Sequence, residues 1–438
     1  MSDTHAQTVP FVRDTMLPQA APPAGQAGAV RWLRENLFSG WMNTALTVLG
    51  LLALFVLVKE MAPWFLHSVW NAGTLSECRQ IIADRWGPDA TGACWAMIRE
   101  RWPQFLFGFY PSNLYWRPVT ALILLFVALA PVLFPGVPRR LMVFSVLYPF
   151  IGFWLLWGGS IWLPVVAILG FVIGYAVWRA LQRRSPLLAL LGGIVAALVW
   201  WLFLAGPVND ALTSALPLGL EMVRSDRFGG FVLSLTIGVA AISLSLPLGI
   251  ALALGRQSDM FLIKTMSVCF IEFIRGVPLI TLLFTASLLL NYFLPPGTNF
   301  DIILRVVIMV TLFAAAYIAE VIRGGLAALP RGQYEAGNAL GLNYFQAQRL
   351  IILPQALKIS IPGIVSTFIG LFKDTTLVIF VGLLDPLKGI TDAIRASTDW
   401  KGIYWEPYIF VGAIFFLFCF GMSRYSMYLE RRLKRDHR

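Results

Sequence analysis

Residues 329–358 read LPRGQYEAGNALGLNYFQAQRLIILPQALK, a polar stretch that separates apolar runs at 303–322 and 361–384. A helix needs about 20 predominantly apolar residues to cross the hydrocarbon layer of a bilayer. The stretch is too polar to do so, whereas the runs on either side are apolar enough. It therefore predicts a surface segment that connects two membrane-spanning helices.

The first half of this segment has the features of a short helix. Pro330 suits a helix start, because the N–H that proline lacks would have no partner in the first turn. Residues 333–340 form helices readily, and Gly341 can adopt the left-handed conformation that closes a helix. The pattern predicts a helix that begins after Pro330 and ends at Gly341.

The second half predicts another helix. Asn343 suits an N-cap, with Gln346 three residues later as in a capping box. Pro354 disfavours helical geometry at Leu353, so we expect this helix to end there. Such a helix pair can dock as a rigid knob in a groove of a partner, although a surface connector without a partner has the same periodicity. The residues expected on its apolar face are Tyr344, Ala347, Leu350 and Ile351.

The composition of the whole chain is that of a membrane protein. Of its 438 residues, 58% are hydrophobic and only 13% are charged, compared with about a quarter charged in soluble domains. The net charge of +11 comes from basic residues in short segments between apolar runs, which is the positive-inside pattern of cytoplasmic loops. No basic surface is left over, so we do not expect nucleic acid as a partner.

Ten apolar runs can be distinguished, which predicts an all-α integral membrane protein with about ten transmembrane helices. The basic segments place the N-terminus, the segment 326–358 and the C-terminus in the cytoplasm. The runs lie near 42–62, 118–136, 141–158, 161–178, 187–205, 229–254, 274–293, 303–322, 361–384 and 406–426.

The runs fall into two blocks of five, with a tail at each end. The first long apolar run begins too late for a signal peptide, so we expect the N-terminal tail to be disordered and cytoplasmic. The expected parts are the tail 1–37, an N-terminal membrane extension 38–207 with a periplasmic loop 63–117, a second block 225–430 with the cytoplasmic segment 326–358, and a basic cytoplasmic tail 431–438.

The outside loop carries six tryptophans and two cysteines. Tryptophan favours the membrane–water boundary because its ring is apolar and its N–H is polar, so we expect a small cap on the outer surface. Cys78 and Cys94 can form a disulfide in an oxidising periplasm; free thiols are the alternative. No cysteine and histidine spacing predicts a metal site, and the three histidines form no catalytic set.

The cytoplasmic segment resembles the EAA loop of binding-protein-dependent ABC transporter permeases. In that family the pattern is Glu-Ala-Ala, three residues, Gly, nine residues, then Ile-x-Leu-Pro. The chain departs from it only at Gly337, where the family usually has alanine, at the expense of some helix propensity. The matching positions are Glu335, Ala336, Gly337, Gly341, Ile351, Leu353 and Pro354.

The resemblance implies that these residues form coupling helices that sit in a cleft of an ATP-hydrolysing subunit. The chain has no G-x-x-x-x-G-K-[ST] phosphate loop. We therefore expect ATP and Mg²⁺ on a partner ATPase dimer, with neither cofactor nor enzymatic activity on this chain. The resemblance also implies a type I (MetI-like) importer core, a second related permease chain in a heterodimer, and a periplasmic amino-acid-binding protein, all at a bacterial inner membrane.

Further motifs of the second block resemble polar amino-acid permeases of the same family. They are SLTIG at 234–238, EFIRGVPL at 272–279, AEVIRGG at 319–325 and KDTTL at 373–377. The first block, including FGFYP at 107–111, is similar to the M-type subunit of general L-amino-acid permeases. The resemblance implies import of L-amino acids, either polar ones or a broad range.

Two acid–base pairs lie near or within spans. Glu272 and Arg275 are three residues apart, as are Glu320 and Arg323, so each pair can meet on one helix face. Ionisable residues are costly in a membrane and mark either pairing or function. We expect neutralised pairs near the cytoplasmic boundary that contribute to a gate or only to the structure.

Another charged motif lies inside the run 361–384. A zwitterionic amino acid needs acceptors for its ammonium group and donors for its carboxylate. Proline lacks a backbone donor and frees a carbonyl, and transporters use such interrupted helices at their sites. The hypothesised translocation site comprises Gly276, Pro278, Asp374, Thr375 and Thr376; packing between permease subunits is the alternative.

The sequence therefore predicts the permease subunit of an ATP-driven importer of L-amino acids. A secondary amino-acid transporter driven by an ion gradient is the alternative, which predicts uptake without any ATPase. The segment 329–358 argues against that alternative. A membrane-embedded enzyme would need a set of His, Asp or Ser side chains that the sequence lacks, and the charged motif in 361–384 disfavours a structural scaffold.

Overall fold

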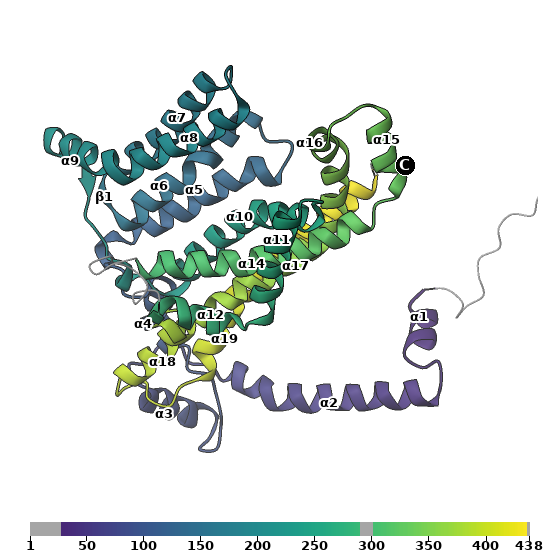
Figure 1. The fold of residues 1–438 in the computed structure, drawn as a ribbon. Coiled ribbons are helices and arrows are strands. Elements are labelled where there is room, and N and C mark those ends of the chain that lie inside the picture. Colours follow the sequence, from purple (N-terminus) through teal and green to yellow (C-terminus); the bar gives the residue numbers. More distant parts are fainter. Residues whose placement is uncertain (1–27, 290–300, 436–438) are drawn as a thin grey trace, which may run out of the picture. The chain divides into compact units, whose positions relative to one another are not determined.

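The computed structural model describes residues 28–289 and 301–435 of the chain, and its elements are almost all helices (Figure 1). It divides into two compact units, Met1–Val69 with Cys78–Ala93, and Trp70–Glu77 with Cys94–Arg438. Within the described residues, nine helices are long and apolar enough to cross a membrane, and ten spans result if one bent helix pair counts as a span. The predicted all-α membrane architecture with about ten spans is confirmed.

The first unit contains α1 (Gly28–Asn36), α2 (Trp41–Leu66) and most of α3 (Leu75–Trp86). Helix α1 corrects the expectation of a disordered tail over 1–37, because residues 28–36 are helical; residues 1–27 lie outside the described part. An ion pair of 2.8 Å between Arg31 and Glu35, four residues apart, supports this helix. Helix α2 is apolar on all sides and buries none of its side chains within its unit, as expected of a lipid-facing span.

After the stretch 70–77, the second unit contains α4 (Ala96–Phe107), the 3₁₀ turn η1 (Ser112–Leu114) and four spans arranged as two hairpins. Cys78 and Cys94 are both disulfide-bonded, whereas Cys269 and Cys419 are free. The first hairpin comprises α5 (Trp116–Leu133), the 3₁₀ turn η2 (Arg139–Leu141) and α6 (Met142–Trp157). The second comprises α7 (Trp162–Leu181) and α8 (Pro186–Val199), which continues through the π-helical turn η3 (Trp200–Leu204) into α9 (Ala205–Ala215).

The second hairpin is closed by small residues and indole hydrogen bonds. A Cβ atom at Gly174 would lie only 3.0 Å from the carbonyl oxygen of Gly193, so the backbones of α7 and α8 approach closely. Trp200 donates to the carbonyl of Val166 at 2.9 Å, and Trp201 donates to that of Ala167 at 3.0 Å. The hairpin is joined to the following linker by a two-residue antiparallel ladder, β1 (Gly159–Ser160) with β2 (Gly219–Leu220).

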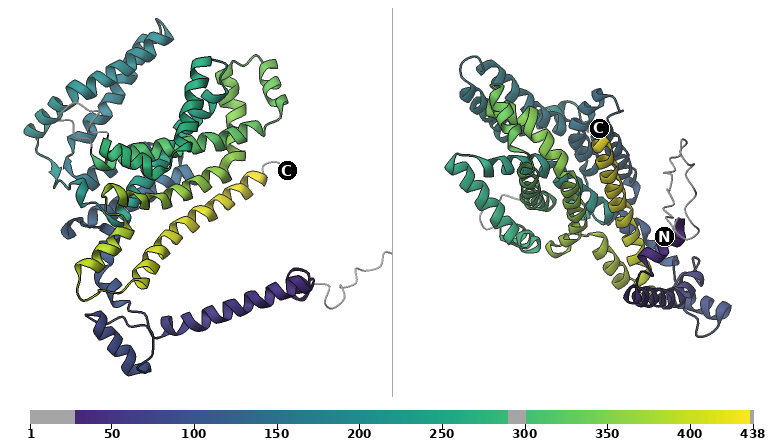
Figure 2. Two further views of the ribbon diagram at one scale, coloured as in Figure 1. Left: turned by 60° about the horizontal axis from the view of Figure 1, so that its bottom comes forward. Right: turned by 90° about the vertical axis from the view of Figure 1, so that its right-hand side faces the viewer.

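The core of the second unit is built on α10 (Gly230–Gln257) and α14 (Ile302–Ala327), which pack side by side (Figures 1 and 2). A Cβ atom at Gly249 would lie 2.7 Å from Cγ2 of Ile318, which shows how closely the two helices approach. Helix α17 (Leu353–Asp374) packs on α14, and α19 (Trp405–Arg435) packs on α17. The 3₁₀ turn η4 (Ser225–Arg227) leads into this core.

One span of the core is broken. Helices α11 (Phe261–Gly276) and α12 (Leu279–Phe284), followed by the π turn η5 (Thr285–Leu289), meet at an angle of 102°. The expected run at 274–293 is therefore wrong in its start, because the helix begins at Phe261, and residues 290–300 lie outside the described part. Pro278 stands directly before α12, where its missing N–H does not interrupt a helix.

The remaining helical segments lie between the core spans in the chain. They are α15 (Arg331–Ala339), α16 (Tyr344–Ala347), the π turn η6 (Gln348–Ile352), the 3₁₀ helix η7 (Thr375–Val381) and α18 (Pro386–Ala396). Helix α18 packs on α4, and Trp400 donates to Oε2 of Glu100 at 2.9 Å.

Helix α18 begins at a fully buried carboxylate. The side chain of Asp385 accepts hydrogen bonds from the backbone N–H groups of Leu387 and Lys388, both at 3.0 Å. Removal of the charge from water outweighs these bonds and raises the pKa of Asp385 to about 6. Between about pH 4 and 6 the folded protein therefore holds a proton that the unfolded chain has released.

This pKa predicts a loss of stability as the pH rises through 6. The free energy of unfolding should fall by up to about 3 kcal/mol between pH 4 and pH 7. Asp385→Asn retains a capping oxygen but cannot titrate, so it should flatten this part of the profile. Thermal unfolding of the solubilised protein measures the effect, with Asp399→Asn on the exposed loop after α18 as the control. A wild-type profile that rises with pH over this range would contradict the prediction.

Candidate functional site

The segment 331–352, here termed the knob, has the predicted helix–turn–helix geometry. Gly341 has a φ of +69°, which is the left-handed conformation expected at the end of the first helix. Asn343 accepts from the backbone N–H of Gln346 at 2.9 Å, and Gln346 accepts from the backbone N–H of Asn343 at 3.1 Å. The capping box is confirmed.

The predicted end of the second helix at Leu353 is wrong. Helix α16 continues through η6 into α17, so that residues 344–381 form one helical span. Proline blocks an α-helix because it lacks the N–H that bonds to the carbonyl four residues earlier. The π-helical turn directly before Pro354 shifts this bonding pattern and lets the helix continue.

The root of the knob is buried in the transmembrane core. Ile352 lies in an apolar cluster with Ile318, Ile322 and Leu326 of α14. Gln355 donates to Oε1 of Gln333 at 2.9 Å and so joins α17 to the first helix of the knob. The knob is thus packed directly against α14 and joined to α17.

The tip of the knob is exposed and apolar. Phe345 and Leu340 are 70% and 73% exposed, and Tyr344 and Leu350 are similarly open. Ala347 and Ile351 are partly buried and face Gly337 of the first helix. The four residues expected on one apolar face are therefore divided between two surfaces. Exposed apolar side chains on a polar segment mark an interaction surface.

The predicted coupling residues are divided in the same way. Gly337 is buried against Ala347, and a Cβ atom added there would meet the Ala347 Cβ at 3.5 Å, an ordinary contact. The alanine that the family usually has at this position would therefore fit without displacing its neighbours. Exposed members are Glu335, Ala336, Gly341 and Pro354, and partly buried members are Ile351 and Leu353.

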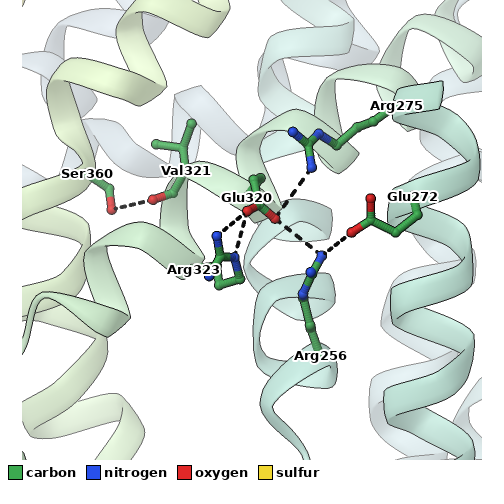
Figure 3. A network of polar contacts seen from close by, with 7 residues as sticks. All are labelled: Arg256, Glu272, Arg275, Glu320, Val321, Arg323 and Ser360. Carbon is green, nitrogen blue, oxygen red and sulfur yellow. Dashed lines mark hydrogen bonds and ion pairs between the residues drawn. The ribbon is translucent and has the colours of Figure 1, made fainter. Parts of the chain in front are cut away.

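Five charged side chains form a network at the C-terminal ends of α10 and α14 and on α11 (Figure 3). Arg323 donates from Nε to Oε1 of Glu320 at 2.7 Å, which confirms the predicted pair. The predicted pair of Glu272 with Arg275 is wrong. Glu272 instead bonds Nη1 of Arg256 at 2.8 Å, and Arg275 lies 3.6 Å from Oε2 of Glu320.

The centre of this network is Glu320. Its carboxylate contacts guanidinium groups from α10, α11 and α14, with Arg256 Nη1 at 3.3 Å from Oε2. Arg275 also lies over the ring of Tyr317 at 5.6 Å. A spacing of three residues permits Glu272 and Arg275 to meet, but each of them contacts a charge on a neighbouring helix instead. Sequence reasoning missed Arg256, because its partners are 16 and 64 residues away.

The predicted translocation residues lie on neighbouring elements. Gly276 and Pro278 form the break before α12, and α12 packs against η7, which begins at Thr375. Thr375 is fully buried, and its hydroxyl donates to the carbonyl of Phe372 at 2.7 Å; the hydroxyl of Thr376 donates to that of Lys373 at 2.9 Å. Both hydroxyl oxygens are thus left as acceptors only.

Two buried hydroxyl groups in the same core were not predicted as site residues from the sequence. Ser234 of α10 and Thr311 of α14 have no hydrogen-bond partner for their side-chain oxygens among the described residues. Nothing in the local pattern distinguishes them from serine and threonine that bond their own helix.

The network predicts unequal effects for its two carboxylates. Glu320→Gln leaves three arginines without their common counter-charge and should lower the free energy of unfolding by about 2–3 kcal/mol. Glu272→Gln removes one partner from a side chain that is 53% exposed, so its effect should stay below about 1 kcal/mol. Thermal unfolding of the solubilised chain gives the order. Equal effects of the two variants would show that Glu320 is not the centre of the network.

The comparisons with known proteins agree with this geometry. A family described as "Binding-protein-dependent transport system inner membrane component" matches residues 245–435. The chain is 68% identical over its full length to the full length of the glutamate/glutamine/aspartate/asparagine transport system permease protein BztC of Rhodobacter capsulatus. It is 39% identical to the inner membrane amino-acid ABC transporter permease protein YhdY of Escherichia coli, over 92% of this chain and 93% of that protein.

Among solved structures, the chain is similar to an amino-acid ABC transporter crystallised with histidines, with 32% identity and a TM-score of 0.41 over 46% of this chain and 91% of that one. The two full-length relatives extend over both blocks of spans, whereas the family match covers the second. The family match and the two full-length relatives confirm the resemblance found in the sequence. The chain belongs to the multi-pass inner-membrane permease subunits of binding-protein-dependent amino-acid ABC transporters, which are not enzymes themselves and work with an ATPase and a binding protein.

Proposed function

We propose that this permease subunit imports acidic amino acids and their amides, and that ATP with Mg²⁺ is bound and hydrolysed on a partner ATPase dimer that holds the knob. The substrate class rests on the 68% identity to a relative named for glutamate, glutamine, aspartate and asparagine. The coupling role rests on one observation, the exposed apolar tip of a rigid helix pair whose root is buried in the core.

The knob is suited to transmit force because its two ends differ. The tip offers Leu340, Tyr344 and Phe345 to an apolar groove of the ATPase, while Ile352 packs among the isoleucines of α14. Closure of the ATPase dimer would displace the knob and with it α14, α17 and the network around Glu320. The spans then exchange between two states whose populations ATP shifts.

The substrate path lies, in this proposal, between the break at 276–278 and the start of η7. The half-buried Asp374 would accept the ammonium group of the amino acid. The oxygens of Thr375 and Thr376 would support the same group, because their protons already bond carbonyls of their own helix. Backbone N–H groups at the broken helix would serve the carboxylate.

In the same proposal, both termini and the knob lie in the cytoplasm, a second related permease chain lies beside this one in the bilayer, and the binding protein lies outside. Two observations support this arrangement. The basic residues gather in the segments assigned to the cytoplasm. Cys78 and Cys94 are disulfide-bonded, as expected for a loop in an oxidising compartment.

The proposal is tested in proteoliposomes that contain the chain, a partner permease and an ATPase. Uptake of labelled glutamate or glutamine should require ATP and the binding protein. Uptake without the ATPase, driven by an ion gradient, would favour the alternative of a secondary transporter.

Replacement of Gly341 tests the coupling role. Gly341→Val places a β-branched residue at a φ of +69°, which should strain the turn by about 1–2 kcal/mol and move the tip. The variant should lose co-purification with the ATPase and ATP-driven uptake. Gly332→Val is the matched control, because that residue is equally exposed, has ordinary φ and has free space around it. Full ATPase binding by Gly341→Val would contradict the coupling role.

Replacement of Asp374 tests the substrate path. Asp374→Asn should reduce glutamate uptake by about tenfold or more, since a neutral amide holds an ammonium group less strongly, while ATPase binding stays intact. Asp392→Asn on α18 serves as the control. Normal uptake would end the site hypothesis, and loss of the second permease chain from the complex would indicate packing between subunits instead.

A further inference from the structure

A chain of hydrogen bonds joins the first block of spans to the N-terminal end of α14. The indole N–H of Trp157, at the end of α6, donates to Oγ of Ser225 in η4 at 2.8 Å. The hydroxyl of Ser225 in turn donates to Oδ2 of Asp301. Asp301 is the N-cap of α14 and accepts from the backbone N–H groups of Ile303 at 2.9 Å and Leu304 at 3.2 Å.

This relay runs in one direction only. Indole nitrogen is solely a donor and an ionised carboxylate solely an acceptor, so a hydroxyl between them must accept from the one and donate to the other. The Ser225 residue is 8% exposed, which shields both bonds from water. Oδ1 of Asp301 accepts the two capping hydrogen bonds of α14, whereas Oδ2 accepts the bond from Ser225. The bond to Ser225 is therefore additional to helix capping.

Further contacts around this relay hold the linker against α5 and α6. Phe228 is fully buried and stacks on Trp157 with ring centroids 4.5 Å apart. The backbone N–H of Val223 donates to the carbonyl of Trp157 at 2.8 Å. Arg117, at the start of α5, donates to the carbonyl of Glu221 at 2.6 Å. The linker 221–228 is thus fastened to both helices of the first hairpin.

Helix α14 is therefore anchored at two widely separated points. Asp301 stands at one end and Glu320 stands 19 residues later, about 28 Å along the helix. The second anchor adjoins the isoleucines that hold the root of the knob. A helix held at one end and displaced at the other tilts, whereas a helix held only at the displaced end moves as a whole.

We propose that Ser225 and Trp157 are positioning residues for transport, through which the N-terminal block of spans holds the outer end of α14 while the knob displaces its inner end. The inference rests on the proposed importer function. It assigns the first hairpin, α5 and α6, the role of a fixed support for the moving helix. It also makes the efficiency of coupling depend on a serine that belongs neither to the knob nor to the proposed substrate path.

The test compares Ser225→Ala, Ser225→Thr and Trp157→Phe with wild type in ATP-driven proteoliposomes. Alanine and phenylalanine at these positions break the relay and should lower the number of amino acids imported per ATP hydrolysed by about three- to tenfold. ATPase binding and ATP turnover should be retained. Threonine restores the hydroxyl and should restore the ratio. Trp162→Phe is the matched control, since its indole donates to Leu216 in the same block, outside the relay.

A distance measurement tests, independently of transport, whether the relay holds α14 against the first hairpin. Spin labels at Phe153 on α6 and Leu304 on α14, both exposed, should give a narrow distance distribution in a chain whose free cysteines are replaced by serine. Ser225→Ala should broaden it, and Ser225→Thr should not. An unchanged import ratio together with an unchanged distribution in Ser225→Ala overturns the inference. Absence of ATP-driven uptake in wild type would instead refute the importer function.

Discussion

The carboxylate of Glu320 holds together the ends of three helices, and the second unit depends on this interaction. Arginine side chains from α10, α11 and α14 converge on it, and a second carboxylate, Glu272, neutralises part of the remaining charge. Three guanidinium groups without this centre would repel one another at close range. The network also stands beside the apolar cluster that holds the knob, so charge and packing secure the same region of α14.

Helix α14 accordingly contacts the root of the knob, the charged network, the broken span and the linker after the first block. Its C-terminal part carries Glu320 and contacts the root of the knob, and its N-terminal cap bonds the linker that follows the first block. Arg305, one turn after the cap, donates to the carbonyl of Ser287 at 2.8 Å and so joins α14 to the broken span. Two relatives are similar to this chain over nearly its whole length and so share the first block.

The interruptions of helices are placed where proline and glycine allow them. Gly276 and Pro278 lie at a break where a span bends by 102°. A bilayer tolerates such a break only where protein or water satisfies the backbone groups of the bend. Pro354, by contrast, does not interrupt its helix. The π turn before it shifts the pattern of backbone hydrogen bonds, so the helix continues although proline lacks an N–H. The knob is thus joined rigidly to α17 rather than through a hinge.

Much of this protein was determined by local sequence. The number of spans follows from apolar runs, the capping box from Asn343 and Gln346 three residues apart, and the turn of the knob from Gly341, because each depends on side chains within one or two turns of chain. Glu320 and Arg323 met as expected for the same reason. The resemblance to the permease family rested on motifs of this local kind.

Only the tertiary structure decided the contacts between distant segments. Spacing alone favoured a pair of Glu272 with Arg275, but helix packing brought Arg256 to Glu272 and Arg275 to Glu320. The continuation of the helix past Pro354 depended on a π turn that no residue pattern announces. Ser225 and Asp301 are 76 residues apart, and a bond between them exists only because the first hairpin and α14 pack against the same linker. Local interactions are set by the chain itself, whereas such partners are set by how whole helices pack in three dimensions.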